Sequence, residues 1–246
     1  MDLIKDLPKV TKVLLIINIA MFILASLYPS INQVLALHYF ESSLFSPHQI
    51  VSHIFMHSGL THLFFNMYAL VVFGGILEKQ LSSKKFTFLY FFSAIGAFSL
   101  HMGIIWYEVS NIPADMLNLI QTEGAEIIAN GQNYTDDLLG KLNAKYNGAM
   151  VGASGAIMGL LAGFAILFPN AKLGIIFIPI PVKAKYFIPI YMIIELFLGV
   201  SEFQWDNIAH FAHIGGAVFG FFLLFIWKKN GEINSKSRPV NENRVM

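Results

Sequence analysis

A serine between glycines and a pair of histidines are the residues of this sequence whose types and spacing could do chemistry. Ser154 lies in NGAMVGASGAIMGLLAGF, residues 147–164, at the head of an apolar run, and His210 and His213 begin another apolar run. A serine hydroxyl becomes a nucleophile when a neighbouring base takes its proton, and histidine is the usual base. The pattern predicts nucleophilic catalysis, although a serine in this place could also be a helix N-cap.

The spacing of small residues indicates which histidine is the base. Ala212, Gly216 and Gly220 recur every four residues, which allows close approach to a neighbouring helix. At 100° per residue, His213 lies about 60° from the centre of this stripe, and His210 lies about 120° from it. We therefore expect His213 to be the general base, and we expect His210 to point away.

His62 and Asn66 are two further polar residues in an apolar run. They lie four residues apart in THLFFNM, so they share one face of a helix. They could form a hydrogen bond between helices, or they could donate to a developing oxyanion. His53 and His57 precede them, but no H-E-x-x-H motif or completing carboxylate is present, so we expect no metal site and no cofactor.

The composition indicates a membrane protein. Of the 246 residues, 56% are hydrophobic and only 13% are charged, whereas a soluble domain has about 25% charged residues. The chain has no cysteine, which excludes disulfides and thiol catalysis. The net charge of +1 gives no reason to expect a nucleic-acid partner.

Six apolar stretches predict an all-α membrane bundle, and they run over residues 10–28, 60–77, 86–107, 150–168, 186–200 and 208–227. A helix needs about 20 residues to cross the hydrocarbon core. A helix from Ser154 to just before Pro169 has about 15 residues, or about 22 Å, so it falls short by about 8 Å. We expect the non-helical backbone before Ser154 to line a water-filled cavity below the external surface. A helix N-terminus there presents unpaired N–H groups to an oxyanion.

The positions of the basic residues predict the orientation in the membrane. With both termini in the cytoplasm, all of the 16 Lys and Arg residues except Lys141 and Lys145 lie on the cytoplasmic side. Residues 29–59 are then an external loop, apolar and aromatic enough to lie in the membrane interface. Residues 108–148 form an external insert with helix-like patches. We expect a membrane domain over 1–230 and a polar cytoplasmic tail over 231–246.

Three motifs together resemble the rhomboid intramembrane serine proteases. They are HSGLTHLFFNM, GASGA and AHIGGAVFG, which fall in this order within the six predicted spans. The resemblance covers nearly the whole chain and implies a six-helix bundle whose first external loop lies in the interface. It implies cleavage of single-pass transmembrane substrates near their external ends.

The resemblance also assigns roles to residues. It implies that Ser154 is the nucleophile and His213 the base, in a dyad with no acidic third member. His62, Asn66 and the Ser154 backbone N–H would form the oxyanion hole, and Gly152 would keep its floor open. His53 and His57 match histidines that brace the first loop in relatives. The first loop lacks the Trp-Arg pair of many members, and the 108–148 insert is longer than the usual connection.

Glu195 is an acidic residue inside the fifth apolar stretch, and an intramembrane acid is a functional candidate by default. We expect it to make a structural hydrogen bond or to be protonated, because no motif places it at the dyad. Two alternatives to a protease are an inactive rhomboid-like protein that binds membrane clients and a small transporter. We expect the plasma (inner) membrane of a bacterium, and the sequence predicts no oligomeric state.

Overall fold

The computed structural model describes residues 6–175, 178–201 and 208–233 of the chain. Asp206, which the sequence places about two turns from His213, lies outside these residues, as does the tail from residue 234. The helices that build the membrane domain are α1 (Lys9–Leu27), α4 (Leu60–Ala69), α5 (Gly75–Leu81), α6 (Ser83–Val109), α10 (Ser154–Leu167), α11 (Ala184–Ser201) and α12 (His210–Lys229). A π-helical turn, η2 (Leu70–Gly74), joins α4 to α5, so the three form one continuous helical segment.

Within the described residues, five helical segments are long and apolar enough to cross a membrane. They are Lys9–Leu27, Leu60–Leu81, Ser83–Val109, Ala184–Ser201 and His210–Lys229. The fourth predicted stretch forms α10, an apolar helix of 14 residues. At 1.5 Å per residue it is about 21 Å long, which agrees with the predicted short helix. The protein is a multi-pass, all-α membrane bundle.

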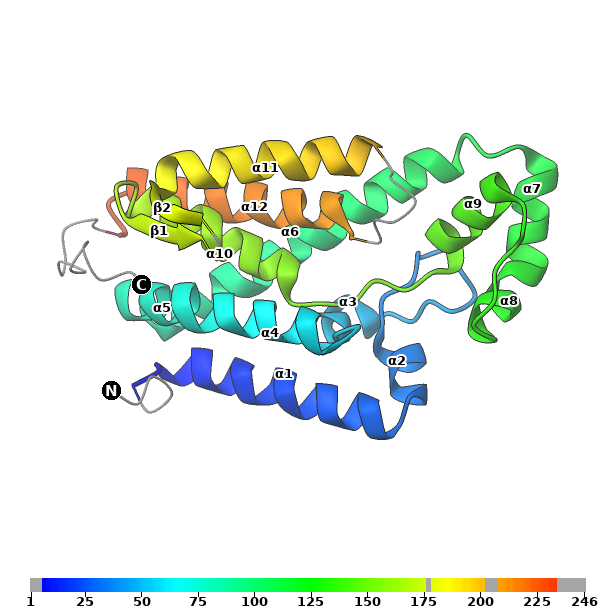
Figure 1. Cartoon of the computed structure of the whole chain (residues 1–246), viewed down its shortest axis with the longest axis horizontal. Helices are drawn as coiled ribbons and strands as arrows, with labels where there is room; N and C mark the ends of the chain where they lie inside the picture. The colour runs from blue at the N-terminus through cyan, green and yellow to red at the C-terminus, as the bar shows by residue number, and fades with distance from the viewer. Residues whose placement is uncertain (1–5, 176–177, 202–207, 234–246) are drawn as a thin grey trace.

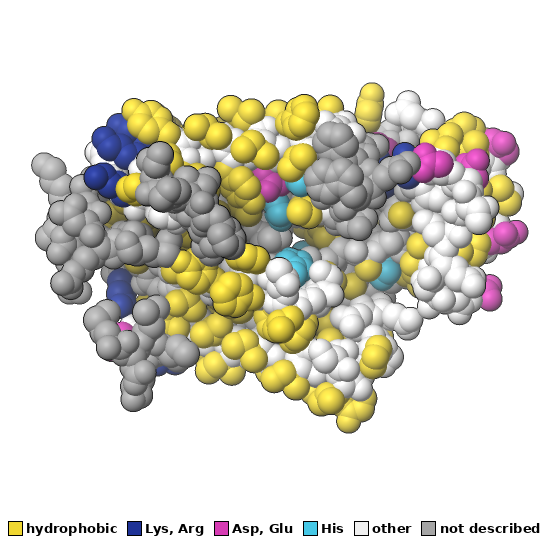
Figure 2. Space-filling view, viewed as in Figure 1, with side chains coloured by type: hydrophobic (Ala, Val, Ile, Leu, Met, Phe, Trp, Pro, Cys, Tyr) yellow, Lys and Arg dark blue, Asp and Glu magenta, His cyan; other side chains and the backbone are white. Residues whose placement is uncertain are grey.

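Figure 1 shows how the helices are arranged. α1 lies along one edge of the molecule, the α4–α5 segment lies next to it, and α11 and α12 form the opposite edge. The first membrane helix begins and the last one ends at the same end of the bundle. Figure 2 shows Lys and Arg side chains gathered at that end and Asp and Glu side chains at the other.

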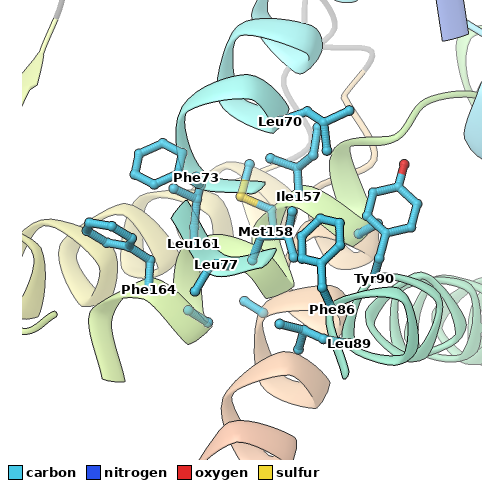
Figure 3. Close-up of a cluster of buried hydrophobic side chains, with 14 of the residues drawn as sticks. Leu70, Phe73, Leu77, Phe86, Leu89, Tyr90, Ile157, Met158, Leu161 and Phe164 are labelled. Atoms are coloured by element: carbon cyan, nitrogen blue, oxygen red, sulfur yellow. The ribbon is translucent and has the colours of Figure 1, made fainter. Parts of the chain in front are cut away.

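The short helix α10 lies in the centre of the bundle and packs against both α6 and α12, which also pack against each other. All of its residues except Ser154, Ala165 and Ile166 are buried. Figure 3 shows its side chains meeting those of the α4–α5 segment and α6, among them Phe73, Phe86 and Phe164. The helix that begins with the candidate nucleophile is therefore held on several sides by protein.

Glycines bring the backbones of α10 and α12 into contact. A Cβ on Gly216 would collide with the carbonyl oxygen of Gly155, and a Cβ on Gly220 would lie 2.5 Å from Gly159 Cα. Lipid tails provide no hydrophobic drive for one membrane helix to join another, so such close van der Waals packing holds them together. The predicted small-residue stripe of α12 thus faces α10, which brings the start of each helix close to the other.

The 108–148 insert is helical, as its patches predict. It contains α7 (Ala114–Leu119), a π-helical turn η3 (Ile120–Gly124), α8 (Ala125–Ala129) and α9 (Asp137–Asn147). The first external loop contains α2 (Ser30–Leu35), α3 (Gln49–Ser52) and a 3-10 turn η1 (His53–Phe55). Insert, loop and the end of α6 share a second apolar cluster: Leu37, Tyr39, Met102, Ile105, Val109, Ile120 and Tyr146.

The loop between α10 and α11 differs from the all-helical prediction. It forms an antiparallel hairpin of β1 (Lys172–Ile175) and β2 (Ile178–Lys183), in which Lys172 pairs with Lys183. Its run IIFIPIPV is too short and too uniformly apolar for periodicity to distinguish strand from helix. Pro179 and Pro181 fit in β2 because each strand of a two-stranded sheet has one unpaired edge.

Candidate active site

Ser154 is the first residue of α10, and the segment that leads into it is fixed to the first external loop. Met150 and Leu37 exchange backbone hydrogen bonds of 2.8 and 2.9 Å, and Gly152 N–H donates to the carbonyl of His53 at 3.0 Å. Gly152 has a φ of +128°, which side-chain-bearing residues rarely adopt. A backbone conformation that suits glycine therefore precedes the serine at the helix N-terminus.

The structure brings Ser154 together with the predicted base. His213 Nε2 lies 2.8 Å from Ser154 Oγ, although the two residues are 59 positions apart in the chain. His213 is buried, with 8% of the residue's surface exposed, whereas Ser154 remains partly accessible. This distance allows the imidazole to accept the hydroxyl proton.

The expectation that no acidic residue contacts the dyad is wrong in this structure. Glu195 of α11 places its Oε2 atom 2.9 Å from His213 Nδ1, on the opposite side of the ring from Ser154. The same oxygen lies 2.6 Å from His210 Nδ1. His210 therefore contacts the same carboxylate that contacts the predicted base. Sequence spacing could not predict this cluster, because Glu195 comes from a different helix. Which face of α11 meets α12 depends on how the two helices pack.

His62 lies on the other side of Ser154, against Gly152. A Cβ built on Gly152 would come within 2.8 Å of His62 Cε1 and Nε2, and within 3.5 Å of Ser154 Oγ. His62 Nδ1 lies 3.0 Å from the hydroxyl of Ser58. If Ser58 donates this bond, the imidazole proton is on Nε2, which faces the serine side and can donate to an oxyanion. Ser58 precedes the helix, so helical periodicity gave no signal for it.

Asn66 makes a contact within its own helix. Its Nδ2 donates to the carbonyl of His62 at 3.0 Å, which uses one of the two amide protons. The side chain is buried, one turn after His62 and on the same face of α4. The structure thus places Asn66 beside His62, and no described contact joins it to Ser154.

Three buried histidines lie in the loop over residues 29–59, and two of them hydrogen-bond to backbone carbonyls. His38 Nδ1 bonds to the carbonyl of Asn147 at 2.9 Å, and His53 Nδ1 bonds to that of Gln49 at 2.7 Å. Burial lowers the pKa of His53 to about 4. Burial, and to a smaller extent the charge of the nearby His62, lowers the pKa of His57 to about 4. The ring of His57 packs edge-on against His62, with centroids 5.1 Å apart.

The 108–148 insert takes part in bracing the first loop. Ser42 donates to the Asn147 side chain at 2.7 Å, and the Tyr146 hydroxyl donates to the carbonyl of Glu41 at 3.0 Å. Both Tyr146 and Asn147 are in α9, the last helix of the insert. The loop that lacks a Trp-Arg pair is therefore anchored by residues of the insert.

Figure 2 shows histidine side chains and an acidic side chain at the centre of one face, where the molecule is hollowed between its two halves. One group of the described residues could also hold a metal ion: it consists of Glu195, His210 and His213. Each offers one ligand atom, and these three atoms lie within 4.8 Å of one another. Their contacts of 2.6 and 2.9 Å have the lengths of hydrogen bonds.

Comparison with known proteins gives a consistent family match. Residues 45–230 match the model of the Rhomboid domain. The mitochondrial presenilin-associated rhomboid-like protein of Homo sapiens is 30% identical over 156 residues, covering 55% of this chain and 38% of that protein. The mitochondrial Rhomboid protein 1 of Saccharomyces cerevisiae is 28% identical over 180 residues, covering 72% of this chain and 40% of that protein. The rhomboid protein YdcA of Bacillus subtilis is 28% identical over 182 residues, covering 72% of this chain and 66% of that protein. The chain thus spans less than half the length of the mitochondrial relatives.

Proposed function

The chain belongs to the rhomboid family, and we propose that it is an intramembrane serine endopeptidase. The observation that carries this proposal is the 2.8 Å contact between His213 Nε2 and Ser154 Oγ at the start of a short buried helix. An inactive client-binding member would need neither the hydroxyl nor a base beside it. In this chain both groups are present, and they are within hydrogen-bond distance.

The reaction we propose begins with attack of Ser154 Oγ on a substrate peptide carbonyl. The Oγ–C bond forms as the hydroxyl proton passes to His213 Nε2, and negative charge develops on the carbonyl oxygen. The C–N bond then breaks, and His213 gives the proton to the leaving amine. Water attacks the resulting ester with His213 again as base, which releases the second product and restores the serine.

The developing oxyanion needs donors that are already in position. We propose the backbone N–H of Ser154, His62 Nε2 and the second amide proton of Asn66. The N–H groups at the start of a helix have no partner within it, and the helix dipole adds partial positive charge there. Gly152 supports this arrangement because any larger residue would fill the space between Ser154 and His62.

We propose single-pass transmembrane proteins as substrates, cleaved near their external ends. The active serine begins a helix of 14 residues, about 9 Å shorter than a hydrocarbon core of about 30 Å. A peptide bond that reaches it must therefore enter the upper part of the membrane and leave its helical conformation there. The family resemblance supports the same substrate class.

We also propose that both termini are cytoplasmic and that the insert is external. The basic end of the molecule in Figure 2 would then be cytoplasmic and the acidic end external. We propose the plasma membrane of a bacterium as the location, although the comparisons do not support it: the human and yeast relatives are named mitochondrial, and the name of the Bacillus subtilis relative gives no location. A reporter fused at Asn230 that is active on the external side would refute this orientation.

Labelling with a serine-directed fluorophosphonate, together with cleavage of a fluorogenic transmembrane peptide in detergent, tests the proposed function. Wild-type protein should be labelled and should cleave, whereas Ser154→Ala and His213→Ala should each abolish cleavage. The double variant should be no worse than either single one, because the pair acts as a unit. Wild-type-like cleavage by Ser154→Ala would overturn the assignment.

A further inference from the structure

Glu195 is an acidic residue on a helix that otherwise faces largely lipid. It is buried, with 4% of its surface exposed, whereas the neighbouring Ile193, Leu196 and Phe197 of α11 are exposed on the apolar exterior. A carboxylate at membrane depth is costly unless polar groups surround it. Its position therefore requires partners, and the structure shows which they are.

Side chains from two helices surround this carboxylate. His210 and His213 lie three residues apart on one face of α12, and the Nδ1 atom of each lies within 2.9 Å of the same oxygen, Oε2. Tyr191 lies one turn earlier in α11, on the same face of the helix as Glu195. These contacts compensate for removing the carboxylate from water, and they fix the position of Oε2 relative to the ring of His213.

The carboxylate determines which nitrogen of His213 carries the proton. An ionised carboxylate accepts hydrogen bonds and donates none, so Nδ1 of His213 must carry the proton that bonds to Glu195. The neutral ring then has its lone pair on Nε2, the atom that lies 2.8 Å from Ser154 Oγ. This is the tautomer that a general base needs.

We propose that Glu195 is a positioning residue for catalysis, so that the site works as a Ser154–His213–Glu195 relay. Glu195 holds the ring in its active tautomer and orientation, and its negative charge stabilises the imidazolium that forms when Nε2 takes the serine proton. The proton on Nδ1 stays with the ring, and the carboxylate stays ionised throughout. The proposal rests on the serine protease function proposed above.

His210 has a supporting place in this arrangement. Its Nδ1 is the nearer of the two to Oε2, at 2.6 Å, so it ties the carboxylate to the start of α12 as well. The packing leaves little room for the helices to separate here, because a Cβ on Gly199 of α11 would lie 3.0 Å from His210 Cβ. We therefore expect His210→Gln to reduce activity by less than tenfold, with Glu195 still in contact with His213.

Glu195→Gln tests the relay. Its side chain is similar in size but carries no charge, and its amide N–H₂ can favour the wrong tautomer of His213. We expect kcat to fall about 10²–10⁴-fold with KM changed by less than about threefold, in line with the loss of the acid in other serine proteases. Fluorophosphonate labelling should slow in parallel.

The pH dependence of kcat gives a readout that a purely structural role would not change. Activity falls in acid because a protonated His213 cannot accept the serine proton. Within residues 6–175, 178–201 and 208–233, the titratable groups around it are Glu195 from α11, His62 from α4, His101 from α6 and His210 from its own helix. Glu195 is the only acidic group among these. In Glu195→Gln the imidazolium loses this counter-charge, so the acid limb of the profile should lie at lower pH than in the wild-type protein.

Glu78→Gln is the matched control. Glu78 is also a buried glutamate, and its carboxylate accepts hydrogen bonds from the backbone of Val10 and Thr11 and from the Ser83 hydroxyl, far from Ser154. This variant should lower the thermal midpoint but keep wild-type kcat per folded molecule and the same acid limb. Equal behaviour of the two glutamine variants would overturn the relay.

A second measurement on the wild-type protein avoids the risk that Glu195→Gln does not fold. NMR spectra of ¹⁵N-histidine-labelled protein at neutral pH report which ring nitrogens carry a proton. The signals of His213 are those that are absent from the spectrum of His213→Gln, and they should show a proton on Nδ1 and none on Nε2. A proton on Nε2 would overturn the proposal. If wild-type protein is neither labelled nor active, the proposed function itself fails; if it is active and Glu195→Gln matches it in kcat and acid limb, only the relay fails.

Discussion

Gly152→Ala should damage catalysis through His62 while leaving the serine and its base in place. A methyl group at this position would lie 2.8 Å from His62 Cε1 and Nε2, closer than Cβ atoms come to other heavy atoms in real structures. The backbone has little freedom to retreat, because Gly152 N–H donates to the carbonyl of His53 at 3.0 Å. The ring must therefore move, although its Nδ1 contacts Ser58 at 3.0 Å.

Two separate costs follow from the geometry. Displacing His62 removes one oxyanion donor, and the loss of one such donor in other enzymes lowers kcat by about 10²–10³-fold. Forcing a φ of +128° on alanine costs of order 1–3 kcal/mol of folding free energy. The first cost should show in kcat and the second in thermal stability.

A double variant and a matched control separate these costs. In His62→Ala/Gly152→Ala the displaced donor is already absent, so kcat should be no lower than in His62→Ala alone. Gly131→Ala is the control: its φ is +71°, and no atom lies within 4 Å of the added methyl group, so only stability should fall.

Cleavage of a fluorogenic transmembrane peptide in detergent gives kcat, and the thermal midpoint gives stability. Gly152→Ala with wild-type kcat would refute the placement of His62 as a donor. If the effects of Gly152→Ala and His62→Ala instead multiply in the double variant, Gly152 acts on catalysis by another route, and the reasoning from the collision is wrong.

The remaining predictions concern the oxyanion hole, acid stability and metal independence. Asn66→Ala should keep partial activity, with kcat reduced by up to about 10²–10³-fold, because other donors remain; complete loss in a folded variant would contradict this. Because burial holds the pKa of His53 and His57 near 4 in the folded protein, against about 6.5 when unfolded, protons bind the unfolded chain preferentially between these values. Each ring should therefore cost about 1.4 kcal/mol of stability per pH unit as the pH falls through this window, and His57→Gln should flatten the decline of the thermal midpoint. EDTA should leave cleavage unchanged, and loss of activity that added Zn²⁺ restores would instead identify the carboxylate–histidine cluster of α11 and α12 as a metal site.

The structure changes the interpretation of the external insert. The sequence suggests a polar cap near the mouth of the site, and the helices of the insert do lie at the same end of the bundle as the first loop (Figure 1). Its Asn147, however, bonds both His38 and Ser42 of that loop. The insert therefore helps to hold the first loop in place. The carbonyl of His53 in that loop accepts a hydrogen bond from Gly152, so the insert supports the site and does not only cover it.

The sequence by itself determined the features that depend on one helix at a time. Hydropathy located the membrane segments, and the distance from Ser154 to Pro169 predicted that α10 is short. Periodicity distinguished His213 from His210, because both lie on the same helix and only their angle from the small-residue stripe differs. These features could be predicted because the period of 3.6 residues fixes directions within a helix, whatever it packs against.

Only the tertiary structure decided which groups from different segments meet. The sequence could not bring Glu195 to His213, because rotation and translation of α11 relative to α12 follow from side-chain packing along the whole contact. Ser58 reaches His62 across a non-helical turn, so no period relates them, and the hairpin after α10 forms from an apolar run that fits strand and helix equally well. Periodicity acts along one segment. The contacts that join Ser154, His213 and Glu195, the loop anchors and the hairpin all depend on how separate segments pack against one another.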